Sequence, residues 1–237
     1  MRLRDRVAIV TGGGRGIGRA VALGYAREGA HVVVASRTMA QVEEVADEIR
    51  SEGRKSLAVQ TDVTDEVQVE HLVELTLKEF GTIDVLVNNA GAIRPDRIVA
   101  MKTGDWEHVI RVNLTGTFFC CRAVLPTMLA NKRGWIINIS SDSGKRGWPE
   151  GGAYCASKFG IIGLTESLAF EVMHMGIVVN ALCPGAVVTE MSRQGRTEEE
   201  LTGWMQPEDM VGPAVFLASD EARNLLGASV DVFGKVR

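Results

Sequence analysis

Short runs of apolar residues alternate along the chain with longer segments in which apolar residues recur at helical spacing. The short runs are rich in valine, isoleucine and alanine, and their length is that of buried strands. Strands are expected at residues 7–10, 31–35, 57–60, 85–87, 135–139, 177–182 and 230–233. Helices are expected at about 17–25, 38–53, 65–80, 103–113, 114–131, 152–172 and 207–218.

This alternation predicts the fold class. Strands that alternate with helices of ten or more residues imply right-handed βαβ crossovers and a parallel sheet with both faces covered. We therefore expect an α/β protein with a single doubly wound, Rossmann-type domain over residues 1–237, a parallel seven-stranded sheet and helices on both faces. Residues 190–206 have no packing period, which is typical either of a short substrate lid or of a surface loop.

Charge and composition exclude several classes of protein. A formal net charge of −4 leaves no basic footprint for a nucleic-acid backbone. The cysteines form no C-x-x-C pair, so neither zinc nor a disulfide framework is indicated. No apolar run approaches the ~18 residues of a membrane span, and the N-terminus has no apolar signal region. We expect a cytoplasmic protein without metal, nucleic acid or membrane partner.

A glycine-rich turn separates the first expected strand from the first expected helix. It reads Thr-Gly-Gly-Gly-Arg-Gly-Ile-Gly over residues 11–18. Gly12, Gly16 and Gly18 let the backbone turn tightly and approach a pyrophosphate, which the N-terminus of the next helix attracts. The spacing G-x-x-x-G-x-G departs from the general dinucleotide fingerprint, so the position of the turn between strand and helix supports the prediction of a nucleotide site.

The end of the second expected strand indicates which nucleotide is bound. Ser36 and Arg37 stand where the dinucleotide fold places an acid for the adenosine ribose. Arg15 and Arg37 can instead hold a 2′-phosphate, because guanidinium geometry suits phosphate, and the Ser36 hydroxyl can donate to it. This pattern predicts NADP(H). Asp62, after the third strand, either accepts a hydrogen bond from the adenine amine or caps its own strand.

Three polar residues stand in apolar surroundings around the fifth expected strand. Ser141 follows that strand, and Tyr154 and Lys158 are four residues apart on one face of the next helix. A nearby cation favours phenolate, so we expect Lys158 to lower the pKa of Tyr154. A serine hydroxyl beside such a phenol can hold a carbonyl or alkoxide oxygen. The group is suited to interconverting a carbonyl and an alcohol, although a Tyr-x-x-x-Lys pair alone also arises by chance.

Together these residues resemble the short-chain dehydrogenase/reductase family. The resemblance covers almost the whole chain, and the matching residues follow the family's order and spacing. They are Thr11 to Gly18, Asp62-Val63, Asn88 to Gly91, Asn113, Ser141, Tyr154, Lys158 and Pro184-Gly185. The chain departs from the family in its tail, which reads Val-Asp-Val-Phe-Gly-Lys over residues 230–235 in place of a Val-Asp-Gly-Gly-like ending.

The resemblance implies a catalytic tetrad of Asn113, Ser141, Tyr154 and Lys158. Tyr154 would be the acid/base and Ser141 would polarise the carbonyl. Lys158 would hold the nicotinamide ribose and lower the tyrosine pKa, and Asn113 would position a water in the proton relay. The expected cofactor-binding residues are Gly12, Arg15, Gly16, Ile17, Gly18, Ser36, Arg37, Asp62, Val63, Asn89, Ala90, Gly91, Tyr154, Lys158, Pro184, Gly185, Val187 and Thr189.

The substrate is expected to be a small carbonyl or alcohol compound. The candidate lining of its pocket is Ile93, Arg94, Ser143, Trp148, Met191 and Trp204. Residues of these types more often pack in the interior or lie on the surface than contact a substrate.

Three functions remain open from the sequence. The first is an NADP(H)-dependent carbonyl reductase or secondary-alcohol dehydrogenase. The second is a 3-oxoacyl-[acyl-carrier-protein] reductase, for which Lys132 and Arg133 supply one expected basic site, whereas residues 173–175 are Met-His-Met at the other. The third is a catalytically silent nucleotide-sensing protein on the same fold, which the presence of all four tetrad residues opposes.

The helix expected at 152–172 also predicts an oligomer. Its residues are apolar or small on nearly every side, so both of its faces must be covered. The sheet covers only one face. We expect this helix and the one at 114–131 to pack against a second subunit in a homodimer or, as the resemblance implies, a homotetramer.

Overall fold

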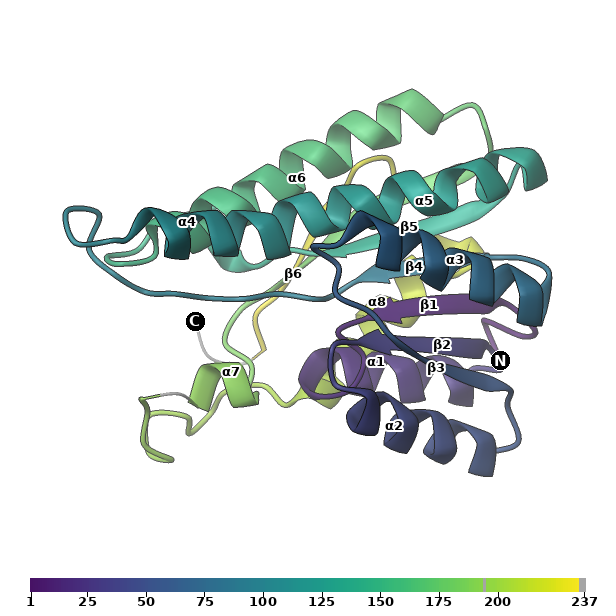
Figure 1. Cartoon of the computed structure of the whole chain (residues 1–237), viewed down its shortest axis with the longest axis horizontal. Helices are drawn as coiled ribbons and strands as arrows, with labels where there is room; N and C mark the ends of the chain where they lie inside the picture. The colour runs from purple at the N-terminus through teal and green to yellow at the C-terminus, as the bar shows by residue number, and fades with distance from the viewer. Residues whose placement is uncertain (194, 235–237) are drawn as a thin grey trace.

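A single parallel sheet forms the centre of the computed structural model, which describes residues 1–193 and 195–234 (Figure 1). Its seven strands lie in the order β3-β2-β1-β4-β5-β6-β7, and every neighbouring pair is parallel. The strands are β1 (Val7–Thr11), β2 (His31–Ser36), β3 (Ser56–Gln60), β4 (Val85–Asn88), β5 (Gly134–Ile139), β6 (Ile177–Pro184) and β7 (Ser229–Val232). The predicted α/β fold class is confirmed.

Helices connect the strands and cover both faces of the sheet (Figure 1). The α-helices are α1 (Gly16–Arg27), α2 (Met39–Ser51), α3 (Glu66–Phe80), α4 (Thr103–Ile110), α5 (Gly116–Asn131), α6 (Gly152–Val172), α7 (Glu190–Arg193) and α8 (Val211–Leu217). The helix predicted at 207–218 begins with a 3₁₀ turn, Pro207–Met210, before α8. The α3 helix has regular ends, because the Asp65 side chain accepts from two N–H groups of its first turn and Gly81 takes the left-handed conformation at its end.

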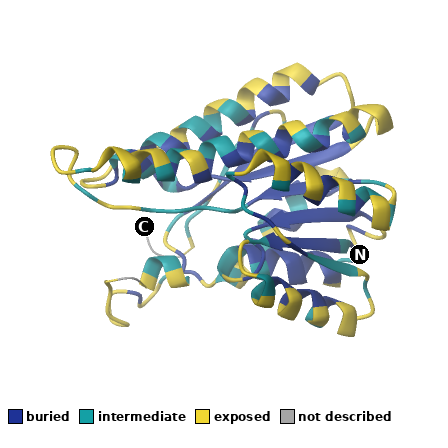
Figure 2. Cartoon of the chain, viewed as in Figure 1, coloured by how far each residue is buried: buried dark blue, intermediate teal, exposed yellow. Residues whose placement is uncertain are grey.

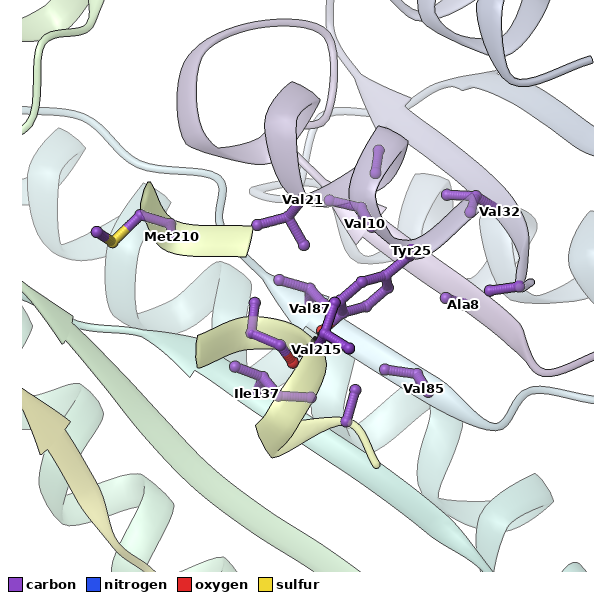
Figure 3. Packing of buried hydrophobic residues seen from close by; sticks show 14 of the residues in the cluster. Ala8, Val10, Val21, Tyr25, Val32, Val85, Val87, Ile137, Met210 and Val215 are labelled. Atoms are coloured by element: carbon purple, nitrogen blue, oxygen red, sulfur yellow. Dashed lines mark hydrogen bonds between the residues drawn. The ribbon is translucent and has the colours of Figure 1, made fainter. Parts of the chain in front are cut away.

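Two hydrophobic clusters lie on opposite faces of the sheet. In β1, Ala8 and Val10 belong to the cluster under α1, α2 and α8, whereas Ile9 belongs to the cluster under α3, α5 and α6. Successive side chains of a strand point to opposite faces, so one continuous apolar run serves both clusters. Figure 3 shows part of the first cluster, with Tyr25 of α1 packed over the sheet. The five inner strands, β2, β1, β4, β5 and β6, are accordingly the most deeply buried elements, whereas the edge strands β3 and β7 are partly exposed (Figure 2).

The two helices predicted at 103–113 and 114–131 are one continuous helical stretch. A π-helical segment, Arg111–Thr115, joins α4 directly to α5. The spacing of apolar residues changes there because the hydrogen bonds of a π-helix span one more residue than those of an α-helix. The change in spacing resembles a break between two separate helices. The prediction of a break at residue 113 is therefore wrong, and Asn113 lies within the π segment.

This long helix is also the one described segment that could cross a membrane by length and composition. It spans Thr103–Asn131 and contains an 18-residue window with a mean hydropathy of 1.2, so the prediction that no apolar segment approaches membrane length needs correction. Its α5 part packs on α3 and its α4 part on α6. Buried side chains of α5, among them Cys120 and Val124, belong to the sheet's second hydrophobic cluster. It is a core helix of this fold.

The strand order places a crevice above the centre of the sheet. The chain leaves β1 towards β2 and β3 on one side, and then crosses to β4, β5, β6 and β7 on the other. The connections that follow β1 and β4 therefore diverge at the carboxyl edge of the sheet. In open α/β sheets, ligands bind in the crevice at such a switch point.

Candidate active site

A cleft of about 660 Å³ opens at this carboxyl edge. Its walls come from segments that directly follow β1, β2, β3, β4, β5 and β6, so residues far apart in the sequence meet there. All the predicted cofactor-binding residues except Gly18 line the cleft. Of the predicted tetrad, Ser141, Tyr154 and Lys158 line it and Asn113 does not.

The glycine turn shapes one end of the cleft. Gly12 and Gly16 have φ values of 62° and 52°, which favour glycine. A side chain at Gly18 would overlap the Gly12 carbonyl oxygen and the Asn89 amide, so Gly18 permits close packing of the turn and does not line the cleft. Arg15, at the N-cap of α1, makes no side-chain capping bond. The free N–H groups of that helix end are therefore available to an anion in the cleft.

The loop after β4 is joined to this turn by hydrogen bonds. The Asn89 side-chain amide donates to the carbonyl oxygens of Thr11 and Gly12 over 3.1 and 3.0 Å. The Thr11 hydroxyl accepts from the backbone of Asn89 and Ala90 over 3.1 and 3.3 Å. These bonds fix the spacing between the carboxyl ends of β1 and β4, where the crevice begins.

The two arginines predicted to hold a 2′-phosphate are in different states. Arg37 is exposed on the cleft and forms no ion pair with any described residue. Arg15 forms an ion pair with Glu190, at the start of α7. Arg37 is therefore free to meet an anion, whereas Arg15 must first exchange its carboxylate partner. The Ser36 hydroxyl accepts from the backbone N–H of Thr38 over 3.3 Å.

Asp62 lines the cleft beside Val63 and also stabilises its own turn. One carboxylate oxygen, Oδ1, accepts from the backbone and the hydroxyl of Thr64 over 2.9 and 2.8 Å. The capping role is therefore present in the structure. Its position on the wall is equally consistent with contact to an adenine amine, which stays a prediction.

Lys158 is held beneath the phenol of Tyr154. Its side chain is 4% exposed, and Nζ donates to the Ile139 carbonyl oxygen over 2.8 Å. Nζ also lies 5.6 Å from the centre of the Tyr154 ring. Burial disfavours the ammonium and lowers the pKa of Lys158 to about 8.

The expected lowering of the Tyr154 pKa is not observed in this structure. Burial of the phenol raises the pKa of Tyr154 to about 12, a hydrogen-bonding contact with Ser141 opposes the rise, and the charge of Asp142 adds to it. The Lys158 ammonium lies towards the face of the ring and bonds to Ile139, so it does not offset burial. The prediction considered the neighbouring cation but not desolvation, which dominates here.

Asn113 lies behind the cleft and is completely buried. Its side-chain oxygen accepts from Ala92 N–H over 2.7 Å, and its amide donates to the Ala92 carbonyl and the Ser157 hydroxyl over 3.0 and 2.8 Å. The amide thus ties the loop after β4 to α6, the helix that carries Tyr154. Its expected role in positioning a water stays a prediction.

The far end of the cleft contains most of the predicted substrate residues. Ile93, Ser143, Trp148, Met191 and Trp204 line it. Arg94 does not, because its side chain lies 4.0 Å from Asp105 outside the cleft, so that assignment is wrong.

Sequence reasoning missed Asp142, Arg146 and Arg196, which also line this end. For Asp142 a signal was available, since a residue directly after Ser141 must lie at the same edge of the sheet. Arg196 offered no comparable signal, because the segment that carries it has no periodic pattern.

The segment predicted as a lid, 190–206, is attached at both ends. It begins with α7, and near its end Met205 exchanges backbone hydrogen bonds with Ala186 and Val188 over 3.1 and 2.8 Å. Within the segment, Leu201 and Met205 are buried. Gln194 lies outside the described residues. Met191, Arg196 and Trp204 border the cleft, which suits a lid, and that role stays a prediction.

Known proteins resemble the chain over nearly its whole length. A sequence model of the short chain dehydrogenase family matches residues 6–200. A 3-oxoacyl-[acyl-carrier-protein] reductase of Staphylococcus aureus is 40% identical in an alignment of 236 positions that covers 96% of each chain. The crystal structure of a putative NAD(P) dependent gluconate 5-dehydrogenase from Beutenbergia cavernae, with bound NADP, is 42% identical with a TM-score of 0.92, over 98% of this chain and 96% of that one. The crystal structure of levodione reductase is 30% identical with a TM-score of 0.91, over 97% and 96%.

Proposed function

The chain belongs to the short-chain dehydrogenase family and is an oxidoreductase that uses NADP(H), and we propose that it transfers a hydride between this cofactor and a ketone or secondary alcohol. The observation that carries the proposal is the meeting of Ser141, Tyr154 and Lys158 in one cleft with the glycine turn. That cleft combines groups that exchange a proton with a site suited to a dinucleotide.

The residues of the cleft fit a phosphorylated dinucleotide. An added Cβ at Gly14 would lie 3.3 Å from the Ser36 hydroxyl and 2.8 Å from the Gln41 Cβ, so only glycine lets the turn pack this closely on the end of β2 and the start of α2. The uncapped start of α1 suits a pyrophosphate, and Arg37 suits a 2′-phosphate. Val187 and Thr189 line the wall beyond them and would contact the nicotinamide end.

The chemistry follows from the groups at the end of β5. When bound, the nicotinamide supplies or accepts the hydride. Tyr154 donates its phenol proton to the carbonyl oxygen during reduction and takes a proton from the alcohol during oxidation. Ser141 holds the same oxygen as its charge develops. Lys158 lines the cleft beside the ring of Tyr154 and would hold the ribose.

A turnover assay against a panel of carbonyl compounds tests this function. We expect the protein to oxidise NADPH with at least one of a set of keto-esters, acyl thioester models, sugars and quinones, and the Tyr154→Phe variant to be inactive with the same compound. NADPH binding without turnover of any compound would instead favour the nucleotide-sensing alternative.

A 3-oxoacyl-[acyl-carrier-protein] reductase is the second candidate. It is favoured by the 40% identity to such an enzyme of Staphylococcus aureus. The surface offers half of the expected carrier contact: Lys132 and Arg133 are exposed before β5, whereas Met173 and Met175 are exposed after α6. Preference for acyl thioesters over keto-esters in the panel would select this candidate.

The environment of the cysteines supports a cytoplasmic location. Cys120, Cys121, Cys155 and Cys183 are all free and buried. Burial raises the pKa of the thiols of Cys120, Cys121 and Cys183. Unpaired, unreactive thiols suit a reducing compartment.

We also propose that α5 and α6 form a subunit interface. Phe159 and Phe170 are 48% and 61% exposed on α6, and eleven residues of helix place them on one stripe, with Gly163 between them. Phe118 and Leu129 are 40% and 38% exposed on α5. Apolar side chains gathered on two adjacent helices are typical of an obligate interface. A second copy of this chain is the proposed occupant, in a dimer or tetramer.

Light scattering tests the interface. A mass of two or four times 25.6 kDa is expected at micromolar concentration, and Phe170→Asp is expected to lower it. Val67→Asp is the matched control, because Val67 is 72% exposed on α3 and outside the proposed interface. A mass equal to one chain for the unmodified protein would rule the interface out.

A further inference from the structure

Asp142 directly follows Ser141 and lies on the wall of the cleft. Its Oδ1 accepts hydrogen bonds from the hydroxyls of Ser141 and Ser143 over 3.0 and 3.3 Å. Its Oδ2 accepts from Nη2 of Arg146 over 2.9 Å. The Asp142 side chain is 26% exposed. A carboxylate is thus in direct contact with the hydroxyl that is expected to hold the substrate oxygen.

This contact determines what the Ser141 hydroxyl can do. A serine hydroxyl has one hydrogen to donate and two lone pairs. The hydrogen is donated to Asp142, and one lone pair accepts from Ser143 N–H over 3.1 Å. In this state the Ser141 hydroxyl donates neither to the phenol of Tyr154 nor to a substrate oxygen. It donates to substrate only after its hydrogen leaves Asp142.

The charge of Asp142 acts on Tyr154 as well. A nearby carboxylate disfavours phenolate, and this effect adds to that of burial at Tyr154. The other ionisable groups facing the phenol are Cys155 and Lys158 on its own helix. Arg146 pairs with Asp142 but is 69% exposed, so it reduces the charge only partly. Asp142 and its partner Arg146 precede α6, whereas Cys155 and Lys158 belong to α6 itself.

We propose that Asp142 is a positioning residue, which holds the Ser141 hydroxyl until a substrate oxygen takes the place of its carboxylate as the hydrogen-bond acceptor. The charge of Asp142 also favours the protonated form of Tyr154, which carbonyl reduction requires. Arg146 moderates this second effect. The inference rests on the proposed function, in which Tyr154 donates the proton.

Titration of the phenol by the near-ultraviolet absorbance of tyrosinate tests the electrostatic part without any substrate. The chain has only two tyrosines, and burial raises the pKa of Tyr25 well above its usual range, so the earlier transition reports Tyr154. Asp142→Asn removes the charge and is expected to lower the midpoint by about 0.5 pH unit or more. Asp142→Glu, which keeps the charge, is expected to restore the midpoint. Loss of the transition in Tyr154→Phe identifies it.

The matched control is Asp47→Asn, which removes a carboxylate paired with Arg50 on the surface of α2. Its titration is expected to coincide with that of the unmodified protein. Arg146→Gln leaves Asp142 uncompensated and is expected to raise the midpoint. The proposal is overturned if Asp142→Asn behaves like Asp47→Asn, or, where that variant does not fold, if Arg146→Gln leaves the midpoint unchanged.

Steady-state kinetics with a ketone from the panel test the positioning part. A neutral amide holds the Ser141 hydroxyl less strongly than a carboxylate does, so Asp142→Asn is expected to lower the KM for the ketone about threefold with little change in kcat. A merely structural residue would raise KM or lower kcat when replaced. An unchanged or higher KM contradicts the positioning role. Failure of the unmodified protein to reduce any ketone would count against the proposed function alone, since the titration needs no substrate.

Discussion

Replacing Tyr154 by phenylalanine is expected to lower kcat for ketone reduction by about 10²- to 10⁴-fold while leaving the affinity for NADPH nearly unchanged. The substitution removes the one oxygen that exchanges the proton and keeps the ring that packs over Lys158. Lys158 remains in place because Nζ bonds to the Ile139 carbonyl oxygen, which the substitution does not touch. Steady-state kinetics give kcat, and quenching of protein fluorescence by NADPH gives the affinity.

Two further variants separate the loss of the proton donor from general damage. Tyr25→Phe removes the same oxygen from the core, where it donates to the Ala214 carbonyl over 2.9 Å, and is expected to retain kcat. Lys158→Met is expected to reduce both kcat and cofactor affinity, because one ammonium serves the phenol and the ribose. Retention of more than about a tenth of the activity by Tyr154→Phe would contradict the acid/base assignment.

The fold could be predicted from the sequence because its strands are buried on both faces. Runs such as Val7 to Val10 are apolar at every position. A strand needs apolar side chains on both faces when helices cover both sides of its sheet, so such runs indicate this architecture. The glycine turn and the spacing of Ser141, Tyr154 and Lys158 then placed the cleft, because parallel strands carry their following loops to one edge. Local patterns thus determined the architecture and most of the cleft wall.

Features that depend on contacts between distant residues could not be predicted. Arg15 pairs with Glu190, and no pattern in either segment relates positions that far apart in the chain. The Tyr154 pKa depends on how deeply the phenol is buried, which spacing along a helix does not reveal. The π segment around Asn113 depends on how α4 and α5 fit the sheet and α6, so the sequence showed only a slip in periodicity.

Converting the cofactor preference from NADP(H) to NAD(H) is expected from the double substitution Ser36→Asp with Arg37→Ala. Arg37 is exposed on the cleft and has no ion-pair partner among residues 1–193 and 195–234, so it can meet a 2′-phosphate without giving up another contact. A carboxylate at position 36 would repel that phosphate and accept from the ribose hydroxyls instead. The KM values for NADPH and NADH, measured with one ketone, report the change.

The structure also ranks the two arginines. A charge-assisted hydrogen bond is worth about 1.5–3 kcal/mol before desolvation, so Arg37→Ala is expected to raise the KM for NADPH about tenfold or more with little change for NADH. Arg15→Ala is expected to have a smaller effect, because binding through Arg15 must first break its pair with Glu190, and that cost offsets part of the gain. Arg50→Ala, which removes an exposed arginine on α2 away from the cleft, is the control. Equal use of both cofactors by the unmodified protein, or an NADPH KM that is indifferent to Arg37, would defeat the assignment of the 2′-phosphate to this side chain.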